Sequence, residues 1–372
     1  MKIVVAPDSF KNSLRASDVA RAIAAGWSSV RPQDEVIQIP MSDGGEGLEE
    51  ALCAALNGAF VECMVCDPFM REHRGKIVIS GDTAVIEAAE ANGIELLARS
   101  ELDPLRATSF GVGELIRVAL SEFHCRNIIV GIGGSATVDG GAGMLQALGF
   151  RFYDCNEAVI PDGLGGGKLD AVRRVDKGQV LPEFAQAQIF VACDVNNILC
   201  GVKGSAAVFG PQKGATPEMV AVLDRNLQHF AAVFDDDGAT PGDGAAGGLG
   251  FALRKLGAQL MPGAQLVMAK NGFADLIADA DVVITGEGCS DDQTVCGKLC
   301  SEIALAARQQ GVPTVLVSGA LKGDCVDLEQ LFAGCFSISR GVCTLDEALG
   351  SAKKNLHKAG AALAAYAGIF SR

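Results

Sequence analysis

The stretch that decides the fold class is NIIVGIGGS, residues 127–135. In it, the β-branched run 128–130 passes directly into a turn rich in glycine. Continuous apolar runs of this length are typical of buried strands in parallel sheets, where both faces of the strand are covered. The same pattern recurs in KIVVAPD (2–8), EVIQIPMSDGG (35–45), DVVITGEG (281–288) and PTVLVSGA (313–320). We therefore predict a parallel β-sheet whose strands end in polar loops.

Amphipathic helices are predicted between these strands. Apolar residues recur at helical spacing over 17–30 and 112–123, and Ser17 suits the N-cap of the first of these helices. A third helix is predicted from Ser301 to Gly311, where the glycine fits a C′ position. Strands and helices that alternate in this way predict a doubly wound, Rossmann-like α/β domain. Ligands of such folds bind beyond the carboxyl ends of the strands, so function is expected in the loops there.

Two stretches interrupt the alternation. Residues 59–103 are rich in strand-forming side chains, and residues 151–274 are mixed and irregular. We predict that these stretches form a second α/β domain inserted into the first, which then comprises residues 1–58, 104–150 and 275–372. A chain of 372 residues is long enough for about two domains.

The composition excludes several classes of function. A formal net charge of −14 disfavours binding to nucleic acid or to anionic membranes. The thirteen cysteines are odd in number and mostly lie in apolar runs, which is typical of free thiols in a reducing compartment. Cys63 and Cys66 form a CxxC pair, but no second pair or histidine cluster completes a zinc site. The first apolar run is too short for a signal peptide, and no run could span a membrane, so a cytoplasmic protein is expected.

Five loops place acid, amide or lysine side chains among glycines; they span residues 6–13, 40–47, 131–143, 194–214 and 285–298. Phosphoryl transfer needs backbone N–H groups around the phosphates, cations that offset charge, carboxylates for Mg²⁺ and a group that orients the attacking hydroxyl. The loops contain candidates for each task. The cations are Lys11, Lys213 and Lys298, the carboxylates are Asp43, Glu46, Glu287 and Asp291, and the orienting group is Asp194.

Other interpretations of these loops remain open at this point. Asp139 and Ser135 could be helix caps, and Lys298 a solvated surface residue. The pattern Gly131-x-Gly133-x-x-Ala136, with Asp154 farther on, matches the dinucleotide fingerprint and predicts an NAD-dependent dehydrogenase. The extra glycines after Asp139 would break the helix that this fingerprint requires. A non-catalytic binding or sensor protein on the same scaffold is a further alternative.

The loop sequences resemble a known family. The blocks APDSFKNSL, PMSDGGEG, GIGGSATVDGGAGMLQALG, VFGPQKGA, GAAGGLG and TGEG, followed by D-x-Q-T and GK, are similar to those of bacterial type I glycerate kinases (glycerate 2-kinases). The match runs in order from Ala6 to Gly319. It implies transfer of the γ-phosphoryl group of ATP to D-glycerate, giving 2-phosphoglycerate and ADP, with Mg²⁺. It also implies a monomer or homodimer of two-domain α/β chains, with the active site in the cleft between the domains.

The resemblance assigns an expected role to each matching residue. The catalytic residues would be Asp194, Lys11 and Lys213, and the glycerate ligands Asp8, Ser9 and Asn197. ATP would be bound by Gly133, Gly134, Ser135, Asp139, Gln293 and Lys298, and Mg²⁺ by Asp43, Glu46, Glu287 and Asp291. The chain departs from the family pattern at Asn12 (usually Gly), Val138 (usually Asn), Ile198 and Cys300 (usually Pro), and Cys289-Ser290 (a larger Arg-Ile-like pair).

Overall fold

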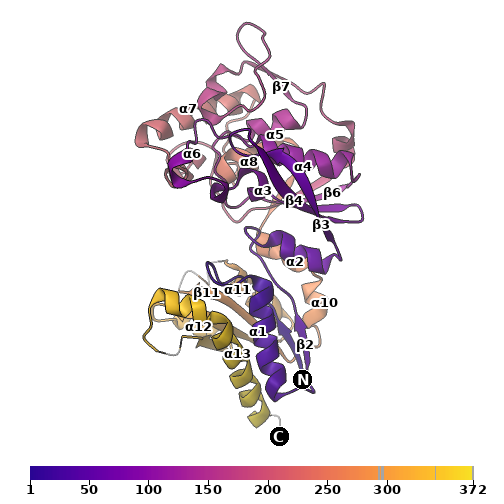
Figure 1. Ribbon diagram of the computed structural model, residues 1–372, viewed down its shortest axis with the longest axis vertical. Coiled ribbons are helices and arrows are strands. Elements are labelled where there is room, and N and C mark those ends of the chain that lie inside the picture. The colour runs from indigo at the N-terminus through magenta and orange to yellow at the C-terminus, as the bar shows by residue number, and fades with distance from the viewer. Residues whose placement is uncertain (292–293, 295–296, 340, 371–372) are drawn as a thin grey trace. The chain divides into compact units, whose positions relative to one another are not determined.

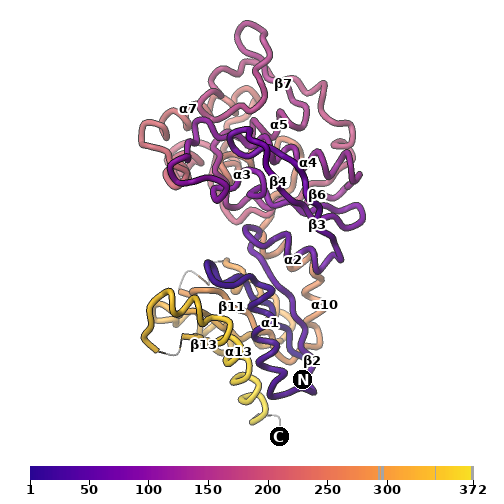
Figure 2. Tube along the Cα trace, in the orientation of Figure 1, coloured from indigo at the N-terminus to yellow at the C-terminus, as the bar shows by residue number. Residues whose placement is uncertain are grey.

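The structure is a computed structural model that describes residues 1–291, 294, 297–339 and 341–370. The chain forms two compact units, drawn as a ribbon in Figure 1 and as a tube in Figure 2. Unit 1 comprises Met1–Asp43, Glu50–Leu56 and Ala264–Arg372, and unit 2 comprises Gly44–Glu49 and Asn57–Gly263. Unit 2 is thus inserted into the chain of unit 1. Both units are built from parallel strands and helices, so the α/β fold class is confirmed.

Unit 1 contains a parallel sheet of five strands. In spatial order these are β13 (Gly334–Ser337), β12 (Thr314–Leu321), β11 (Val282–Ser290), β1 (Lys2–Val5) and β2 (Glu35–Gln38). β1 pairs with β2 on one side and with β11 on the other. The connections from β1 and from β11 therefore run in opposite directions, which makes the gap between these two strands a topological switch point. Loops at such a point are where doubly wound sheets bind ligands.

Helices cover both faces of this sheet. On one face α1 (Ala16–Val30) and α13 (Leu345–Phe370) share a core with β1, β11 and β12, in which Ile23 and Leu356 are fully buried. On the other face α11 (Leu299–Gln309) and α12 (Val326–Leu331) bury Ala304 and Leu328 against the sheet. The remaining helices of this part of the chain are α2 (Leu48–Ala55), α9 (Gly263–Lys270) and α10 (Phe273–Ile277).

Unit 2 contains a mixed sheet of six strands. Their order is β10 (Gln259–Met261), β9 (Gln188–Ala192), β6 (Asn127–Gly131), β5 (Thr83–Glu87), β4 (Glu72–Ser80) and β3 (Ala59–Cys66). The first four are parallel to one another, and β4 and β3 continue the sheet as an antiparallel hairpin. A separate antiparallel pair consists of β7 (Arg151–Tyr153) and β8 (Arg174–Asp176).

One large hydrophobic core holds unit 2 together. The helices of unit 2 are α3 (Ala89–Asn92), α4 (Phe110–Ser121), α5 (Ala142–Ala147), α6 (Ser205–Phe209), α7 (Pro217–Val233) and α8 (Leu249–Lys255). Short 3₁₀ turns lie at Ile94–Leu96, Arg99–Glu101, Gly166–Ala171, Pro182–Gln186, Pro211–Lys213 and Ala245–Gly248. Phe230 and Phe251 meet edge to face with ring centroids 6.3 Å apart, as aromatic pairs in cores prefer.

The structure differs from the sequence prediction in where residues 104–150 belong. They were expected in the Rossmann-like domain, but they lie in unit 2, because β6 pairs with β5 and β9. Residues 59–103 and 151–263 lie in unit 2. The helix expected from 17 starts at Ala16, so Ser17 lies inside it, and the residue at the N-cap is Arg15. Gly311 has the positive φ, 75°, of a C′ residue.

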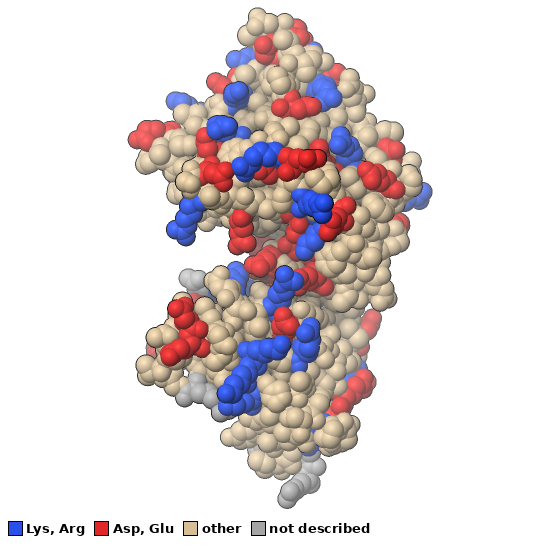
Figure 3. All heavy atoms as spheres, viewed as in Figure 1, with Lys and Arg blue, Asp and Glu red and all other residues tan. Residues whose placement is uncertain are grey.

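On the face seen in Figure 3, both acidic and basic side chains are present on each unit, although acids predominate in the sequence, which has a net charge of −14. None of the helices in the described part of the chain combines the length and apolar character needed to cross a bilayer.

Candidate active site

In unit 1 the first and fifth predicted loops meet at the switch point between β1 and β11. The backbone N–H of Asp8 donates to the carbonyl oxygen of Gly286 at 2.8 Å, which extends the strand pairing into the loops. A Cβ on Gly288 would lie 3.4 Å from the backbone nitrogen of Lys11, so the two loops are in van der Waals contact. Residues that are almost 280 positions apart in the chain are thereby adjacent.

Acidic side chains gather at this point. The pKa of Asp8 is raised to about 7, chiefly by burial and then by the negative charge of Asp43; the N–H of Ser9 and the charge of Lys11 partly offset the rise. Glu287 also raises the pKa of Asp8, so these three carboxyl groups interact. Oε1 of Glu287 accepts hydrogen bonds from the hydroxyls of Ser290 at 2.9 Å and Thr294 at 2.8 Å.

Lys298 and Asp291 lie at the rim of this cluster. Nζ of Lys298 is 3.6 Å from Oδ1 of Asp291, and both side chains are partly exposed. Lys298 is the residue before the first turn of α11, and its carbonyl oxygen accepts a hydrogen bond from the hydroxyl of Ser301. Gln293, predicted to bind the nucleotide, lies outside the described residues.

The oxygen-rich donor set fits Mg²⁺ as a partner of a nucleotide. Among the described residues, no three acidic, histidine or cysteine side chains converge so as to hold a metal ion by themselves. Mg²⁺ is commonly bound through one or two carboxylates, with water and phosphate oxygens completing the octahedron. The mutual repulsion that raises the pKa of Asp8 beside Asp43 and Glu287 is also what a cation would relieve.

In unit 2 the third loop follows β6 and is fixed by Lys213. The Nζ of Lys213 donates to Oγ of Ser135 at 2.8 Å and to the carbonyl oxygen of Thr137 at 2.7 Å. The lysine is only 2% exposed, and burial lowers its pKa to about 7. In this structure Lys213 is thus enclosed, and its contacts differ from the direct ligand contact expected of it. Gly133 and Gly134, which belong to the same loop, are exposed.

Asp139 is enclosed in the same loop. Its carboxylate accepts hydrogen bonds from the N–H and hydroxyl of Ser109 at 2.8 and 2.7 Å and from the N–H groups of Gly141 and Gly143. Burial raises its pKa, and these four donors oppose the rise. Because Asp139 is 0% exposed and is surrounded by internal donors, it shapes the loop, whereas a nucleotide contact was expected.

The fourth loop supplies Asp194 and Asn197 after β9. Oδ1 of Asp194 accepts the N–H of Gly263, the first residue of α9, at 2.8 Å, and Asp194 is exposed. The amide of Asn197 donates to the carbonyl oxygen of Lys203 at 2.8 Å. Both side chains therefore hold loops in place in addition to any role toward a substrate.

The second loop is divided between the units. Asp43 ends the first segment of unit 1, and Gly44 begins unit 2 with φ 92°. A Cβ on Gly44 would lie 2.4 Å from Cβ of Ala192, so only glycine allows this approach to the end of β9. Glu46, predicted as a metal ligand, is exposed in this loop.

Two supporting residues were missed at the sequence level. Ser109 donates to Asp139 from thirty residues away and accepts the N–H of Met144 at 3.0 Å. Asn92 is fully buried. Its side-chain amide donates to the hydroxyl of Thr137 at 3.2 Å, and its backbone carbonyl oxygen accepts the N–H of Ala136. Neither belongs to a motif, and a buried polar residue can be identified only once its partner is known.

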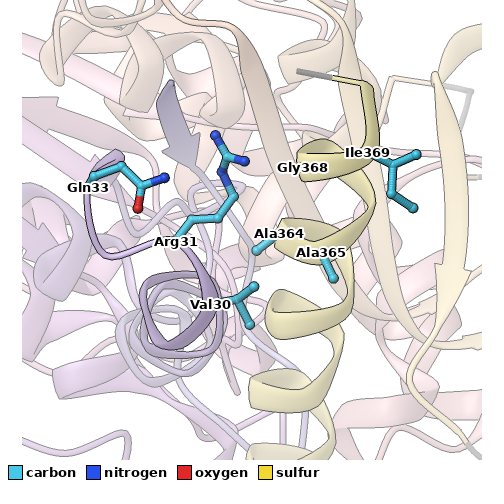
Figure 4. A pocket seen from close by; sticks show the side chains of 7 residues that line it. All are labelled: Val30, Arg31, Gln33, Ala364, Ala365, Gly368 and Ile369. Atoms are coloured by element: carbon cyan, nitrogen blue, oxygen red, sulfur yellow. The ribbon is translucent and has the colours of Figure 1, made fainter. Parts of the chain in front are cut away.

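A surface pocket lies away from all of these residues. It is lined by Val30, Arg31 and Gln33 beyond the end of α1 and by residues 364–369 of α13 (Figure 4). Its one charged lining residue, Arg31, forms an ion pair with Asp34. The pocket therefore lacks the carboxylates and glycine N–H groups that phosphoryl transfer needs.

Comparison with known proteins identifies the family. A sequence model of the glycerate kinase family matches residues 3–367. The chain belongs to the glycerate kinase family. The curated glycerate 2-kinase of Escherichia coli K12 is 43% identical to it over 381 aligned residues, covering 100% of this chain and 99% of that protein. A glycerate kinase of Haemophilus influenzae is 43% identical, with 96% of each chain covered.

A solved structure supports the same family. The crystal structure of a protein assigned as glycerate kinase 2 from Salmonella typhimurium LT2 matches with a TM-score of 0.89 and 40% identity, covering 99% of this chain and 98% of that one. As a member of the glycerate kinase family, the chain is a kinase. The dehydrogenase interpretation fails on geometry as well, because Asp154 follows β7, which is outside the parallel sheet that contains β6.

Proposed function

We propose that this kinase transfers the γ-phosphoryl group of ATP to D-glycerate, with Mg²⁺, and releases 2-phosphoglycerate and ADP. The observation that carries the proposal is the near-complete alignment with a glycerate 2-kinase at 43% identity. The acids and glycine N–H groups at the strand ends are the groups that phosphoryl transfer uses, since its catalysis consists mainly of positioning and charge stabilisation.

In this proposal the acidic cluster of unit 1 receives the metal and the acceptor. Asp43, Glu287 and Asp291 of unit 1 would hold Mg²⁺, which offsets charge on the phosphates. Glu46, which belongs to unit 2, is a further candidate ligand. Lys11 and Lys298 add positive charge beside them. Ser9 and Asn197 would bind glycerate, and Gln293 would bind the nucleotide. Asp8 accepts the proton of the attacking hydroxyl, because a carboxyl group with a pKa of about 7 is suited to general base catalysis at neutral pH.

The glycine loop of unit 2 would cradle phosphate oxygens. The N–H groups of the exposed residues Gly133 and Gly134 would be the donors, and Ser135 lies between them and Lys213. Lys213 and Asp139 act as positioning residues that hold this loop through hydrogen bonds to its residues. Asp194 stays a second candidate for orienting the hydroxyl, since it is exposed at the end of β9.

The test is a coupled ADP-release assay with ATP, Mg²⁺ and D-glycerate, with the product identified by phosphorus NMR. We expect 2-phosphoglycerate as the product. The Asp8→Asn variant should lose at least about a hundredfold in kcat, within the range expected for removal of a general base. A folded protein that turns over none of glycerate and its close analogues would refute the proposal. If Asp194→Asn loses more than Asp8→Asn, the base assignment passes to Asp194.

A cytoplasmic location is part of the proposal. The twelve cysteines in the described part of the chain are all free thiols, as is usual in a reducing compartment.

A further inference from the structure

Glu49 and Glu87 are joined by a reciprocal pair of hydrogen bonds. The backbone N–H of Glu49 donates to Oε1 of Glu87 at 3.0 Å, and the backbone N–H of Glu87 donates to Oε1 of Glu49 at 3.0 Å. The N–H of Gly47 also donates to the Glu87 carboxyl group. These bonds tie the start of α2 to the last residue of β5.

Glu49 is the buried member of the pair. Glu49 is 1% exposed, and its Oε2 has no hydrogen-bond partner among the described residues. The nearest cation is Lys76, whose Nζ lies 3.9 Å from that oxygen and 3.6 Å from Oε1 of Glu90. Burial raises the pKa of Glu49 to about 9, so this carboxyl group is neutral at physiological pH.

This reciprocal pair of hydrogen bonds determines where loop 44–47 lies. Glu87 is in register with Gly131 of β6, and the N–H of Ala88 donates to the carbonyl oxygen of Gly131 at 2.8 Å. A Cβ on Gly131 would lie 2.6 Å from the carbonyl oxygen of Gly44, and one on Gly133 would lie 3.0 Å from Cα of Gly45. The loop 44–47 is therefore laid directly against the glycine loop that follows β6.

We propose that Glu49 and Glu87 are positioning residues that fasten the loop 44–47 against the glycine loop 131–134 through their reciprocal hydrogen bonds. Neither carboxyl group is needed for contact with a ligand, because the hydrogen bonds described above are to backbone N–H groups of the same unit. The consequence for catalysis rests on the proposed function, since it is through Glu46 and the N–H groups of Gly133 and Gly134 that the loops would act.

Hydrogen exchange tests the fastening without any assay of activity. Full-length wild type, Glu49→Ala and Glu49→Gln are compared by mass spectrometry, with Glu62→Ala as the control because the Glu62 side chain is 77% exposed on β3. Loss of a buried partner should speed exchange over residues 44–49 by about tenfold or more in Glu49→Ala. Glu49→Gln keeps the acceptor oxygen and mimics the protonated acid, so it and the control should exchange like wild type.

Kinetics then test the link to catalysis. In Glu49→Ala we expect kcat to fall by about tenfold to a hundredfold, as small misplacements of catalytic groups do. KM for glycerate should change far less, and Glu49→Gln should restore kcat. Unchanged exchange in Glu49→Ala, or faster exchange with normal kcat, overturns the inference. Inactivity of the wild type would refute the proposed function alone, since the exchange result stands by itself. If Glu49→Ala does not fold, Glu87→Ala, which removes the acceptor of the Glu49 and Gly47 N–H groups, replaces it under the same criteria.

Discussion

At the scale of single residues, Lys213 controls how stability depends on pH. Burial lowers its pKa from 10.5 to about 7, so between these values the unfolded chain binds a proton that the folded chain lacks. Lys213 should therefore contribute to the free energy of unfolding an amount that rises with pH across this window, with a slope of at most about 1.4 kcal/mol per pH unit, while the raised pKa of Glu49 contributes the opposite slope up to about pH 9. Lys213→Met removes the rise, whereas Lys203→Met, at an exposed lysine, keeps it.

Urea unfolding at intervals between pH 7 and pH 10 checks this prediction. Parallel curves for wild type and Lys213→Met would show that the buried lysine keeps its ordinary proton affinity.

Asn12 is one of the positions at which the chain departs from the family pattern. It has φ 61°, the left-handed conformation, in the tight turn closed by hydrogen bonds between Phe10 and Leu14. Asparagine tolerates this region better than other residues with a Cβ, which explains how it stands where glycine is usual. Asn12→Gly should change stability by less than about 1 kcal/mol, and Asn12→Val should cost about 2 kcal/mol. Thermal unfolding of the two variants measures the difference, and equal melting temperatures would contradict the assignment of strain.

At the scale of elements, the close packing of α1 on α13 depends on two glycines. A Cβ on Gly26 would lie 1.9 Å from the carbonyl oxygen of His357, and one on Gly360 would lie 2.2 Å from that of Ile23. Gly26→Ala must push the helices apart and should cost about 3 kcal/mol, as overpacked cores do. Gly350 is in α13 with open space around it, so Gly350→Ala should instead stabilise by about 0.5 kcal/mol.

Denaturant midpoints of the two alanine variants decide the matter. If both variants shift the midpoint in the same direction, close helix packing is not what selects glycine at Gly26.

The elements themselves were largely predictable from sequence. The apolar runs at 2–8, 127–135 and 281–288 do become β1, β6 and β11, because continuous β-branched segments have few alternatives. Their pairing partners were not predictable. The run that forms β6 would suit any parallel neighbour; the sequence pattern favours the Rossmann-like domain, whereas the structure pairs β6 with β5 and β9.

The candidate site was predictable in its residue types and less so in its contacts. Asp8 and Glu287 were expected together at strand ends, and the switch point brings them there. The enclosure of Asp139 by Ser109 depends on a contact across thirty residues, which local pattern does not encode. The same is true of the pairing of Glu49 with Glu87.

At the scale of the whole molecule, both units should serve one chemical step. Lys213→Met in unit 2 should lower kcat by on the order of a hundredfold because it releases the glycine loop that Lys213 positions. Glu287→Gln in unit 1 should lower kcat by a similar factor because it removes a charge-stabilising carboxylate. Residues that act on the same transition state are not additive, so the double variant should lose far less than the product of the two effects. Steady-state kinetics of the three variants, with circular dichroism to verify folding, measure this coupling. Strictly multiplicative losses would mean that the two residues act independently.

The close approach at Gly44 bears on how such a chain can change over evolution. Gly44 is where the chain first enters the inserted unit and Gly263 is where it finally leaves, with one return to unit 1 at Glu50–Leu56. A Cβ on Gly44 would lie 3.0 Å from Cα of Gly263. The guest segment thus begins and ends at nearly one point. Unit 1 therefore spans the same short gap whatever the length of unit 2. Once unit 2 is folded, its length adds no loop-closure cost to unit 1. An inserted unit of this kind can be lengthened, shortened or exchanged while the sheet of unit 1 keeps its register.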